Sequence, residues 1–247
     1  MRYLIISDIH ANWEALEAVI EAADHDGFDR IVCCGDLVGY GADPNAVVDW
    51  FRASVPHTIR GNHDKVAVGL ADLDWFNDSA QKAAIWTDQQ LTQENRDYLC
   101  ELPSGPRVVE GFSLVHGSPA DEDEYIVTEE EALSVAHAVL TTVTFFGHTH
   151  LQGGFQYARR RAYEVHAPDA ISTRRELRLD LDDFYLLNPG SVGQPRDHDP
   201  RAAWAIYEPE ERLVVFRRCS YDIAAAAGKI KRAGLPLGLA ARLVMGR

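Results

Sequence analysis

The stretch YLIISDIH, residues 3–10, joins a short apolar run to two side chains that can bind a metal ion, Asp8 and His10. Four further apolar runs are followed by motifs of the same kind. These motifs are GDLVGYG (35–41), GNHD (61–64), VHG (115–117) and GHTH (147–150). Open parallel sheets bind ligands in the crevice at the carboxyl ends of their strands. We therefore expect the five segments to meet at one site.

Strands and helices alternate in the first part of the chain. Apolar residues recur at helical spacing from Trp13 onward, and a second helix is expected after Asp43 as its N-cap, with Pro44 in its first position. Such alternation predicts parallel strands joined by right-handed crossovers. From residue 145 the pattern is that of β-strands, including a hairpin around residues 208–211. The order of elements predicts an α/β fold, a four-layer α-β-β-α sandwich of two mixed sheets with helices outside.

Residues 65–104 interrupt this order with helices only. Two helices are expected, at about 78–91 and 92–101, with Asp78 and Thr92 as their N-caps. Because the segment directly follows the GNHD motif, we expect it to lie beside the site. It forms either an extra helical layer or a small helical cap that shapes a substrate pocket.

Residues 152–183 follow the GHTH motif and are expected to be irregular or to form a hairpin. Six arginines fall between residues 152 and 178, in a chain that is acidic overall. They are either simply exposed or attract a polyanionic substrate. A capping box of Thr128 and Glu131 predicts the start of another helix before this segment. No linker or internal repeat is visible, so we expect one domain over residues 1–247.

The composition is that of a soluble globular protein, with 46 % hydrophobic and 25 % charged residues. The net charge of −14 argues against a nucleic-acid polymer as partner, because such binding depends on Lys and Arg. No signal peptide or membrane span is visible, so no membrane partner is expected. Four cysteines without a disulfide-like spacing predict a reducing, cytoplasmic location. The sequence does not indicate an oligomeric state.

The residue types of the five motifs indicate transition metals. Histidine and carboxylate side chains, with the amide oxygen of Asn62, suit manganese, iron, nickel or zinc. Five of the ten histidines fall in these motifs, which is improbable by chance. The sequence alone leaves the choice among these metals open.

The set DIH, GDLVG, GNHD, VHG and GHTH resembles the motifs of the calcineurin-like metallophosphoesterase superfamily. The resemblance implies two divalent or trivalent transition-metal ions that share Asp36. One ion would be held by Asp8, His10, Asp36 and His150. The other would be held by Asp36, Asn62, His116 and His148. The resemblance also implies that His63 is the catalytic histidine.

Two metal ions of this kind can share a hydroxide that attacks a phosphoester or phosphoanhydride. Asp64, beside His63, either accepts a hydrogen bond from the imidazole and fixes its tautomer or caps the loop that it ends. The expected partner is a phosphorylated small molecule or a nucleotide.

The longer motifs GDLVGYGADPN (35–45) and NPGSVGQPRD (188–197) resemble a bacterial and archaeal subgroup related to the YfcE-like phosphodiesterases. Some members of this subgroup hydrolyse dinucleoside polyphosphates such as diadenosine tetraphosphate. By this resemblance Asn12, Tyr40 and Arg196 border the pocket. Arg196 then offers a planar pair of donors to phosphate, or it forms a salt bridge that anchors the turn.

The leading hypothesis is therefore a dinuclear metal-dependent phosphohydrolase, and the more specific hypothesis is that it acts on a dinucleoside polyphosphate. A phosphodiesterase or a protein phosphatase of the same superfamily is the alternative. A non-catalytic protein-interaction scaffold is the alternative of another class. Such scaffolds tend to lose the catalytic histidine or some of the ligands, whereas His63 and every expected ligand are present in this chain.

Overall fold

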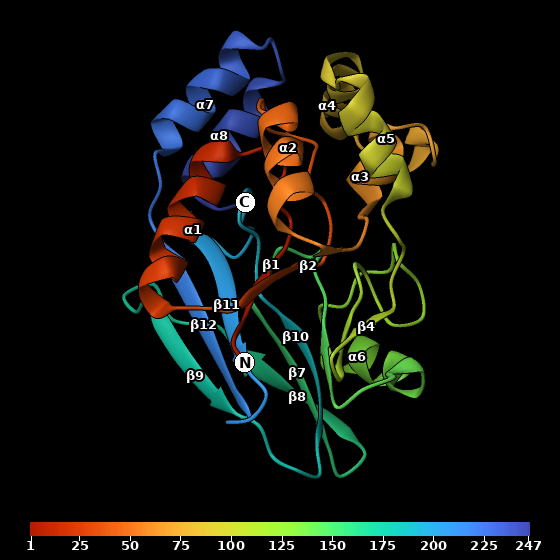
Figure 1. Ribbon diagram of the computed structural model, residues 1–247, viewed down its shortest axis with the longest axis vertical. Helices are drawn as coiled ribbons and strands as arrows, with labels where there is room; N and C mark the ends of the chain where they lie inside the picture. Colours follow the sequence, from red (N-terminus) through yellow and green to blue (C-terminus); the bar gives the residue numbers. More distant parts are fainter.

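Two mixed six-stranded sheets form the centre of the computed structural model, which describes residues 1–247 (Figure 1). The first sheet has the strand order β3 (His57–Thr58), β2 (Arg30–Cys33), β1 (Tyr3–Ile6), β11 (Ala202–Glu208), β12 (Leu213–Cys219) and β9 (Arg174–Arg178). The second has the order β4 (Arg107–Val109), β5 (Phe112–Leu114), β6 (Val143–Phe145), β10 (Phe184–Asn188), β7 (Gly153–Ala158) and β8 (Arg161–His166). In each sheet three neighbouring strands are parallel, β1 to β3 in the first and β5, β6 and β10 in the second.

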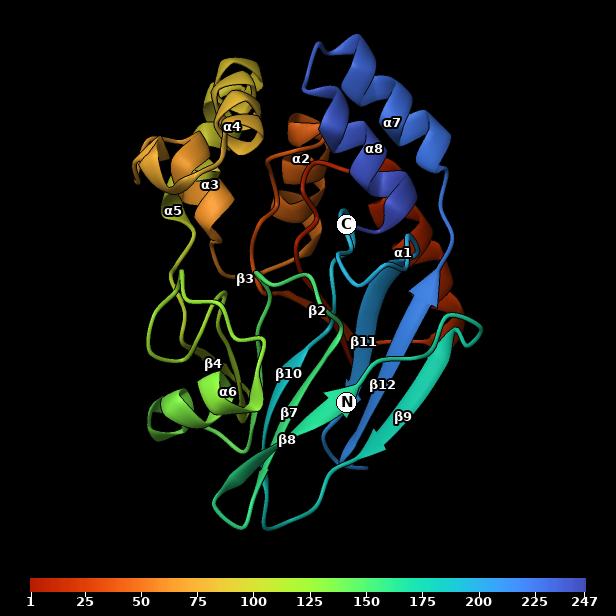
Figure 2. The same ribbon diagram turned by 180° about the vertical axis from the view of Figure 1, so that it is seen from behind.

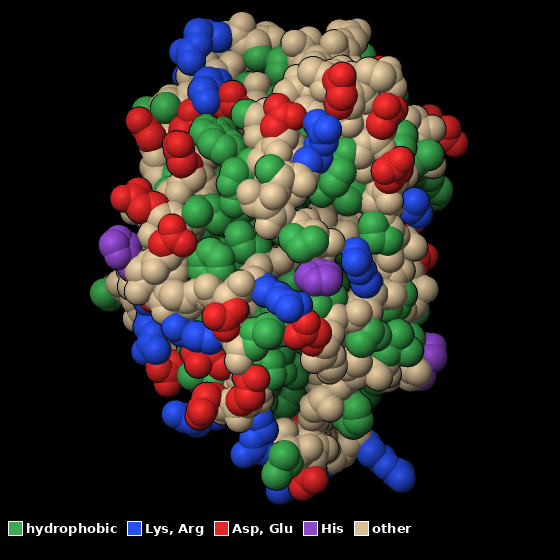
Figure 3. All heavy atoms as spheres, in the orientation of Figure 1, with side chains coloured by type: hydrophobic (Ala, Val, Ile, Leu, Met, Phe, Trp, Pro, Cys, Tyr) green, Lys and Arg blue, Asp and Glu red, His purple; other side chains and the backbone are tan.

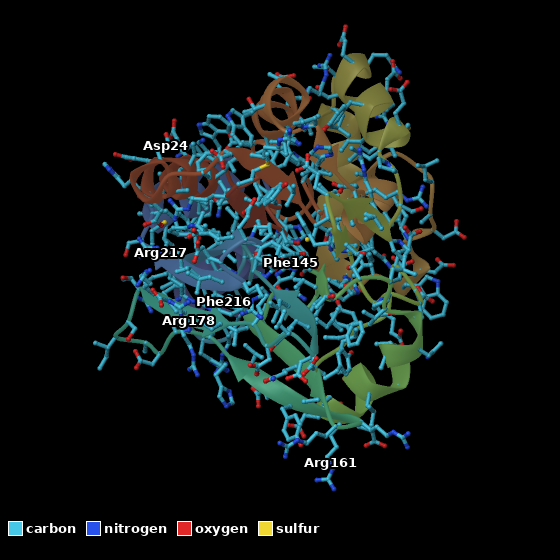
Figure 4. All side chains as sticks on the ribbon, turned by 60° about the horizontal axis from the view of Figure 1, so that its bottom comes forward. Asp24, Phe145, Arg161, Arg178, Phe216 and Arg217 are labelled. Carbon is cyan, nitrogen blue, oxygen red and sulfur yellow. The ribbon has the colours of Figure 1, made fainter.

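The side chains of β1 show how the layers arise from the sequence. Successive residues of a strand point to opposite faces of the sheet. Tyr3 and Ile5 therefore lie in the core between the two sheets, whereas Leu4 and Ile6 lie in the core under the helices. Burying one large apolar side chain contributes roughly 1.5–3 kcal/mol, so both faces stabilise the fold. Figure 4 labels Phe145 and Phe216, which belong to the core between the sheets.

Helices cover the outer faces of both sheets. The first sheet is covered by α1 (Trp13–Asp26) and α2 (Pro44–Ser54), beside which lie α7 (Ile223–Arg232) and α8 (Leu237–Met245). The second sheet is covered by α6 (Glu129–Val135), which continues into the short helix η2 (Ala136–Ala138). The predicted four-layer α-β-β-α sandwich is confirmed. None of the helices combines the length and the apolar character needed to cross a membrane.

The helix ends show where the predicted caps are right. Thr92 and Thr128 are N-caps, and Thr128 forms the expected capping box with Glu131. Asp78 is not a cap, because the side chain of the preceding residue, Asn77, accepts hydrogen bonds from the first turn instead. Asp43 occupies the N-cap position of α2 but makes no capping bond, since its carboxylate binds Lys229 at 2.8 Å.

The segment of residues 65–104 forms a helical group beside α2 (Figures 1 and 2). The two predicted helices are present as α4 (Asp78–Gln90) and α5 (Gln93–Glu101). Two short helices precede them, α3 (Asn62–Ala67) and η1 (Leu73–Trp75), neither of which is visible as a pattern in the sequence.

The segment of residues 152–183 is more regular than the sequence suggests. A hairpin of β7 and β8 extends the second sheet, and β9 forms an edge of the first. The six arginines are all exposed, and basic side chains project from the lower end of the molecule in Figure 3. Arg161 stands at that end in Figure 4, away from α4. None of the six lines the cavity described below, so they do not form a wall of the site.

Candidate metal centre

The loops that follow the strands hold their polar residues in an unusual backbone conformation. Five expected ligands have a left-handed φ, namely Asp8 (54°), His10 (50°), Asp36 (57°), His148 (64°) and His150 (60°). Residues other than glycine rarely adopt this conformation, and they do so most often at functional sites. Hydrogen bonds between loops hold it in place, since the backbone carbonyl of Asp36 accepts the N–H groups of Ile9 and His10.

One cluster of ligand atoms lies between β1 and the GHTH loop. Its members are fully buried and each offers an atom within 4.8 Å of the others: Asp8, His10, Asp36 and His150. The two Nε2 atoms of His10 and His150 are 3.0 Å apart. Asp8 Oδ1 lies 3.4 Å from His150 Nε2, and Asp36 Oδ2 lies 3.6 Å from His10 Nε2.

A second cluster shares Asp36 with the first. It consists of Asp36, His116 and His148, again within 4.8 Å of one another. Asp36 Oδ2 lies 3.4 Å from His116 Nε2, and the side-chain oxygen of Asn62 lies 3.1 Å from the same nitrogen. The structure thus brings together all seven residues expected as ligands, with Asp36 between the two groups.

Backbone carbonyls fix which nitrogen of each imidazole faces the centre. For three histidines the Nδ1–H donates to a carbonyl, so Nε2 is the nitrogen that faces the centre. The acceptors are Val38 for His10 (3.0 Å), Gln194 for His150 (2.6 Å) and Cys34 for His116 (2.8 Å). His148 is reversed, because its Nε2 lies 3.1 Å from the carbonyl of Asp123 and leaves Nδ1 free.

The two clusters fit metal cations. With Nδ1 protonated on both rings, the bare lone pairs of His10 and His150 face each other at 3.0 Å. The Oδ2 atoms of Asp8 and Asp36 are buried and have no hydrogen-bond partner. A buried acceptor without a hydrogen-bond partner destabilises the folded state, and cations bound to these acceptors would offset that cost. Histidine nitrogens with carboxylate oxygens form a donor set typical of transition metals.

Two members of the clusters bind protons more tightly than usual. Burial raises the pKa of Asp8 to about 7. Burial would lower the pKa of His116, but the carboxylates of Asp36 and Asp8 outweigh it and raise that pKa to about 9. Near neutral pH the protein therefore holds protons on groups that a metal ion needs in their deprotonated form.

His63 lies at the edge of the centre, where an acid for catalysis would be needed. Its side chain is buried between the rings of Tyr40 and Phe76, at centroid distances of 4.3 and 4.4 Å, and its Nδ1 has no partner. A Cβ on Gly39, which has φ 92°, would lie 2.5 Å from this nitrogen, so glycine leaves room for the imidazole.

Asp64 does not orient His63. Its Oδ1 accepts the N–H groups of Leu37 and Val38, and its Oδ2 accepts that of Gly61. All three are backbone donors of the loops, as expected for a residue in the first turn of α3. These hydrogen bonds are those of the alternative, a carboxylate that caps the loops, and none of them joins Asp64 to His63.

The three residues expected at the substrate differ in their hydrogen bonds. The side chain of Asn12 caps α1 and donates to the carbonyl of Gly193 at 2.8 Å. The hydroxyl of Tyr40 accepts a hydrogen bond from Arg196 at 3.3 Å. Arg196 forms no salt bridge, and its Nε is buried without a partner.

A cavity of about 600 Å³ opens beside Asn62, His63 and His148. Its walls include residues that the sequence analysis did not single out. Tyr125 lies on the ring of His148 at a centroid distance of 3.9 Å. Lys65 binds the carboxylate of Asp123 at 2.7 Å, which ties α3 to the loop whose carbonyl holds His148. The only signal for this loop in the sequence is the acidic run at residues 121–124.

Known proteins are similar to this chain in sequence and in fold. The family model described as calcineurin-like phosphoesterase superfamily domain matches residues 1–212. An uncharacterized protein of Methanocaldococcus jannaschii is 34 % identical, over 98 % of this chain and 97 % of that protein. The crystal structure of a metallophosphoesterase from Sphaerobacter thermophilus is 40 % identical, with a TM-score of 0.88, over 100 % of this chain and 99 % of that chain. A hypothetical protein of Pyrococcus horikoshii, 19 % identical over 100 % of this chain and 98 % of that chain, has a TM-score of 0.77 and shows the fold alone.

The shared position of Asp36 predicts how metal content responds to substitution. Asp36→Asn keeps the shape of the side chain but removes the charge that both clusters use, so we expect loss of both ions. Asn62→Ala removes a neutral oxygen from one cluster only, so one ion should remain. Elemental analysis after dialysis against metal-free buffer measures how many ions each variant retains. Asp24→Asn, at an exposed carboxylate on α1, is the control and should keep two ions. Two ions retained by Asp36→Asn would contradict the shared ligand.

The pKa values of Asp8 and His116 predict proton release on metal binding. Near pH 8 His116, with its pKa of about 9, is protonated and Asp8 is not, so these two ligands together should release about one proton on binding. Near pH 6 Asp8, with its pKa of about 7, is protonated as well, so release should rise to about two. Metal affinity should therefore increase with pH over this range. Calorimetry of manganese binding in buffers of different ionisation enthalpy counts the protons, and the same count at both pH values would contradict the assignment.

Proposed function

This chain belongs to the calcineurin-like phosphoesterase superfamily and is a metallophosphoesterase, and on that premise we propose that two transition-metal ions serve it in hydrolysing small phosphorylated molecules. The observation that carries the proposal is the pair of histidine clusters joined by Asp36. Manganese, iron, nickel and zinc all suit these donors. A cytoplasmic location and the exclusion of nucleic-acid polymers stay predictions.

The ions, when bound, supply positive charge and activate water, so that no nucleophile from the protein is needed. The ligands would be Asp8, His10, Asp36 and His150 for one ion and Asp36, Asn62, His116 and His148 for the other. The carbonyl groups that hold the imidazoles fix the direction of each donor nitrogen before an ion arrives.

His63 is the residue that we propose to protonate the leaving oxygen. Burial lowers its pKa to about 4, so the imidazole is neutral at pH 7 in the protein without substrate. A phosphate dianion beside the ring favours the imidazolium, so binding of the substrate is coupled to uptake of a proton from water, which catalysis then uses. Tyr40 and Phe76 both pack against the ring and restrict its orientation.

Arg196 is the residue that we propose to bind an oxygen of the reacting phosphate. It lies close enough to His10 and His150 for its charge to contribute to their pKa values, which burial above all holds well below the usual range. Its Nε has no partner, and no carboxylate neutralises it. A partly buried guanidinium with free donors suits a phosphate oxygen.

The substrate lies among three candidates. A dinucleoside polyphosphate such as diadenosine tetraphosphate is the finer expectation, and a phosphodiester or a phosphoprotein is the alternative. His63 is only 4 % exposed at the inner end of its cavity, which favours a small molecule over a folded phosphoprotein. Hydrolysis of diadenosine polyphosphates, cyclic nucleotides and aryl phosphates with added manganese tests the proposed activity, and no turnover of any phosphate compound would contradict it.

His63→Ala is expected to keep the bound metal and to lower kcat by about 10²–10⁴-fold, the usual effect of a positioned acid. The loss should be smaller for nitrophenyl esters, because nitrophenolate leaves without a proton. Metal analysis and a leaving-group series measure the two effects. His137→Ala, at an exposed histidine, is the matched control. Equal losses for good and poor leaving groups would exclude His63 as the acid.

Arg196→Ala is expected to lower kcat/KM by about ten- to hundredfold, the effect of losing hydrogen bonds to a charged group. Because we place Arg196 at the reacting phosphate, the loss should be similar for a nitrophenyl ester and for a nucleotide. Steady-state kinetics on both substrates checks this. Arg161→Ala, in the exposed basic stretch, is the control and should have no effect. A loss confined to nucleotides would place Arg196 at a more distant phosphate.

A further inference from the structure

Four aromatic side chains surround the cavity beside the metal centre: Tyr40, Trp75, Phe76 and Tyr125. We refer to this part of the cavity as the aromatic pocket. Tyr40 and Phe76 are in contact with His63 and lie deep, whereas Trp75 and Tyr125 stand at the opening. With about 600 Å³, the cavity has room for a group the size of a nucleoside.

Trp75 has no role in the packing of the fold. Its side chain is 93 % exposed at the end of η1, although it lines the cavity. Tyr125 is 50 % exposed and packs one face on His148, with the rings inclined by 35°. Large aromatic surfaces left in water beside a pocket are typical of positions that bind a ligand. The two rings come from separate segments of the chain and line the same cavity.

The charges around the opening are almost all negative. Carboxylates of four lining residues are exposed there: Asp72, Asp121, Asp123 and Glu124. The only lysine or arginine among the lining residues is Lys65, whose ammonium is already bound by Glu122 and Asp123. Arg196 contacts Tyr40 and is not part of the lining. A phosphate in the aromatic pocket would therefore be repelled, while the metal centre attracts one.

His63 determines which part of a substrate enters the aromatic pocket. On the proposed function, its imidazole protonates the ester oxygen that leaves, and the same ring forms part of the wall of the cavity. The leaving group must then lie in the cavity, and the phosphate must lie toward the metal ligands.

From these contacts we infer that the enzyme selects phosphate esters of an uncharged aromatic alcohol, such as a nucleoside, which stacks on Trp75 and Tyr125. This inference rests on the proposed function. A water oxygen forms the new bond to phosphorus, the bond from phosphorus to the ester oxygen breaks, and the alcohol leaves with the proton of His63. Ester and water thus give alcohol and inorganic phosphate. A second phosphate on the leaving group is disfavoured by the acidic opening, which argues against dinucleoside polyphosphates as substrates.

Three esters test this selection with manganese present. Adenosine 5′-monophosphate has an uncharged aromatic leaving group, glycerol 3-phosphate an uncharged non-aromatic one, and adenosine 3′,5′-bisphosphate an aromatic one that carries a second phosphate. We expect kcat/KM for the monophosphate to exceed that for glycerol 3-phosphate by about tenfold or more, from the usual gain of stacking one base. It should also exceed that for the bisphosphate, because the acidic opening repels the second phosphate. Equal values for the monophosphate and glycerol 3-phosphate, or faster turnover of diadenosine tetraphosphate, would overturn the inference. Preferred turnover of phosphocholine would overturn it in favour of a cationic leaving group.

Variants at the opening identify the residues responsible. Trp75→Ala should lower kcat/KM for adenosine 5′-monophosphate by about ten- to hundredfold and leave glycerol 3-phosphate unchanged. Ile171→Ala is the matched control, because Ile171 is also 93 % exposed but does not line the cavity. Asp72→Asn should raise turnover of the bisphosphate about two- to fivefold, whereas Asp74→Asn, two residues away and outside the lining, should not. No change in Trp75→Ala would overturn the stacking.

Binding of adenosine alone separates the inference from the proposed function. Calorimetry should detect adenosine binding to the wild-type protein and a weakened signal in Trp75→Ala. If adenosine binds in this way but no phosphate ester is hydrolysed, the proposed function fails and the aromatic pocket remains. If esters are hydrolysed without preference and adenosine does not bind, the inference fails and the proposed function remains.

Discussion

The carboxylate of Asp36 is the group on which the rest of the site depends. Its Oδ2 faces His10 at 3.6 Å and His116 at 3.4 Å, and its Oδ1 accepts the backbone N–H of His63 at 2.8 Å. One side chain therefore fixes both histidine clusters and the start of α3. A Cβ on Gly61 would lie 2.1 Å from Oδ1, so the GNHD loop can approach this carboxylate only with glycine there.

Much of the fold and the meeting of the polar motifs at one place could be predicted because both depend on short-range patterns. In a strand that is covered on both faces, successive side chains enter two different cores, and the structure shows this for Tyr3, Leu4, Ile5 and Ile6. Polar residues after such strands must then meet at one edge of the sheets. The left-handed φ of Asp8 and Asp36 is a consequence of the tight turns that bring them there.

The roles that could not be predicted depend on the direction of a side chain. Asp64 is adjacent to His63 in the chain, but as part of the first turn of α3 it points back to the N–H groups of neighbouring loops. Asn12 precedes a helix, and capping that helix uses its side-chain oxygen. The contact of Tyr125 with His148 joins residues from separate loops, so no local pattern in the sequence could reveal it.

Charge divides the site into two unlike halves. Toward the two Asp and His clusters lies Arg196, a partly buried cation whose Nε has no partner, and these clusters could hold further positive charge. Toward the opening lie exposed carboxylates, with Lys65 already neutralised by Asp123. A substrate with one phosphate can place its anionic end toward the clusters and its uncharged end toward the opening, so it fits the site in a single orientation. A substrate with charge at both ends cannot, so the arrangement selects the direction of binding as well as the kind of molecule.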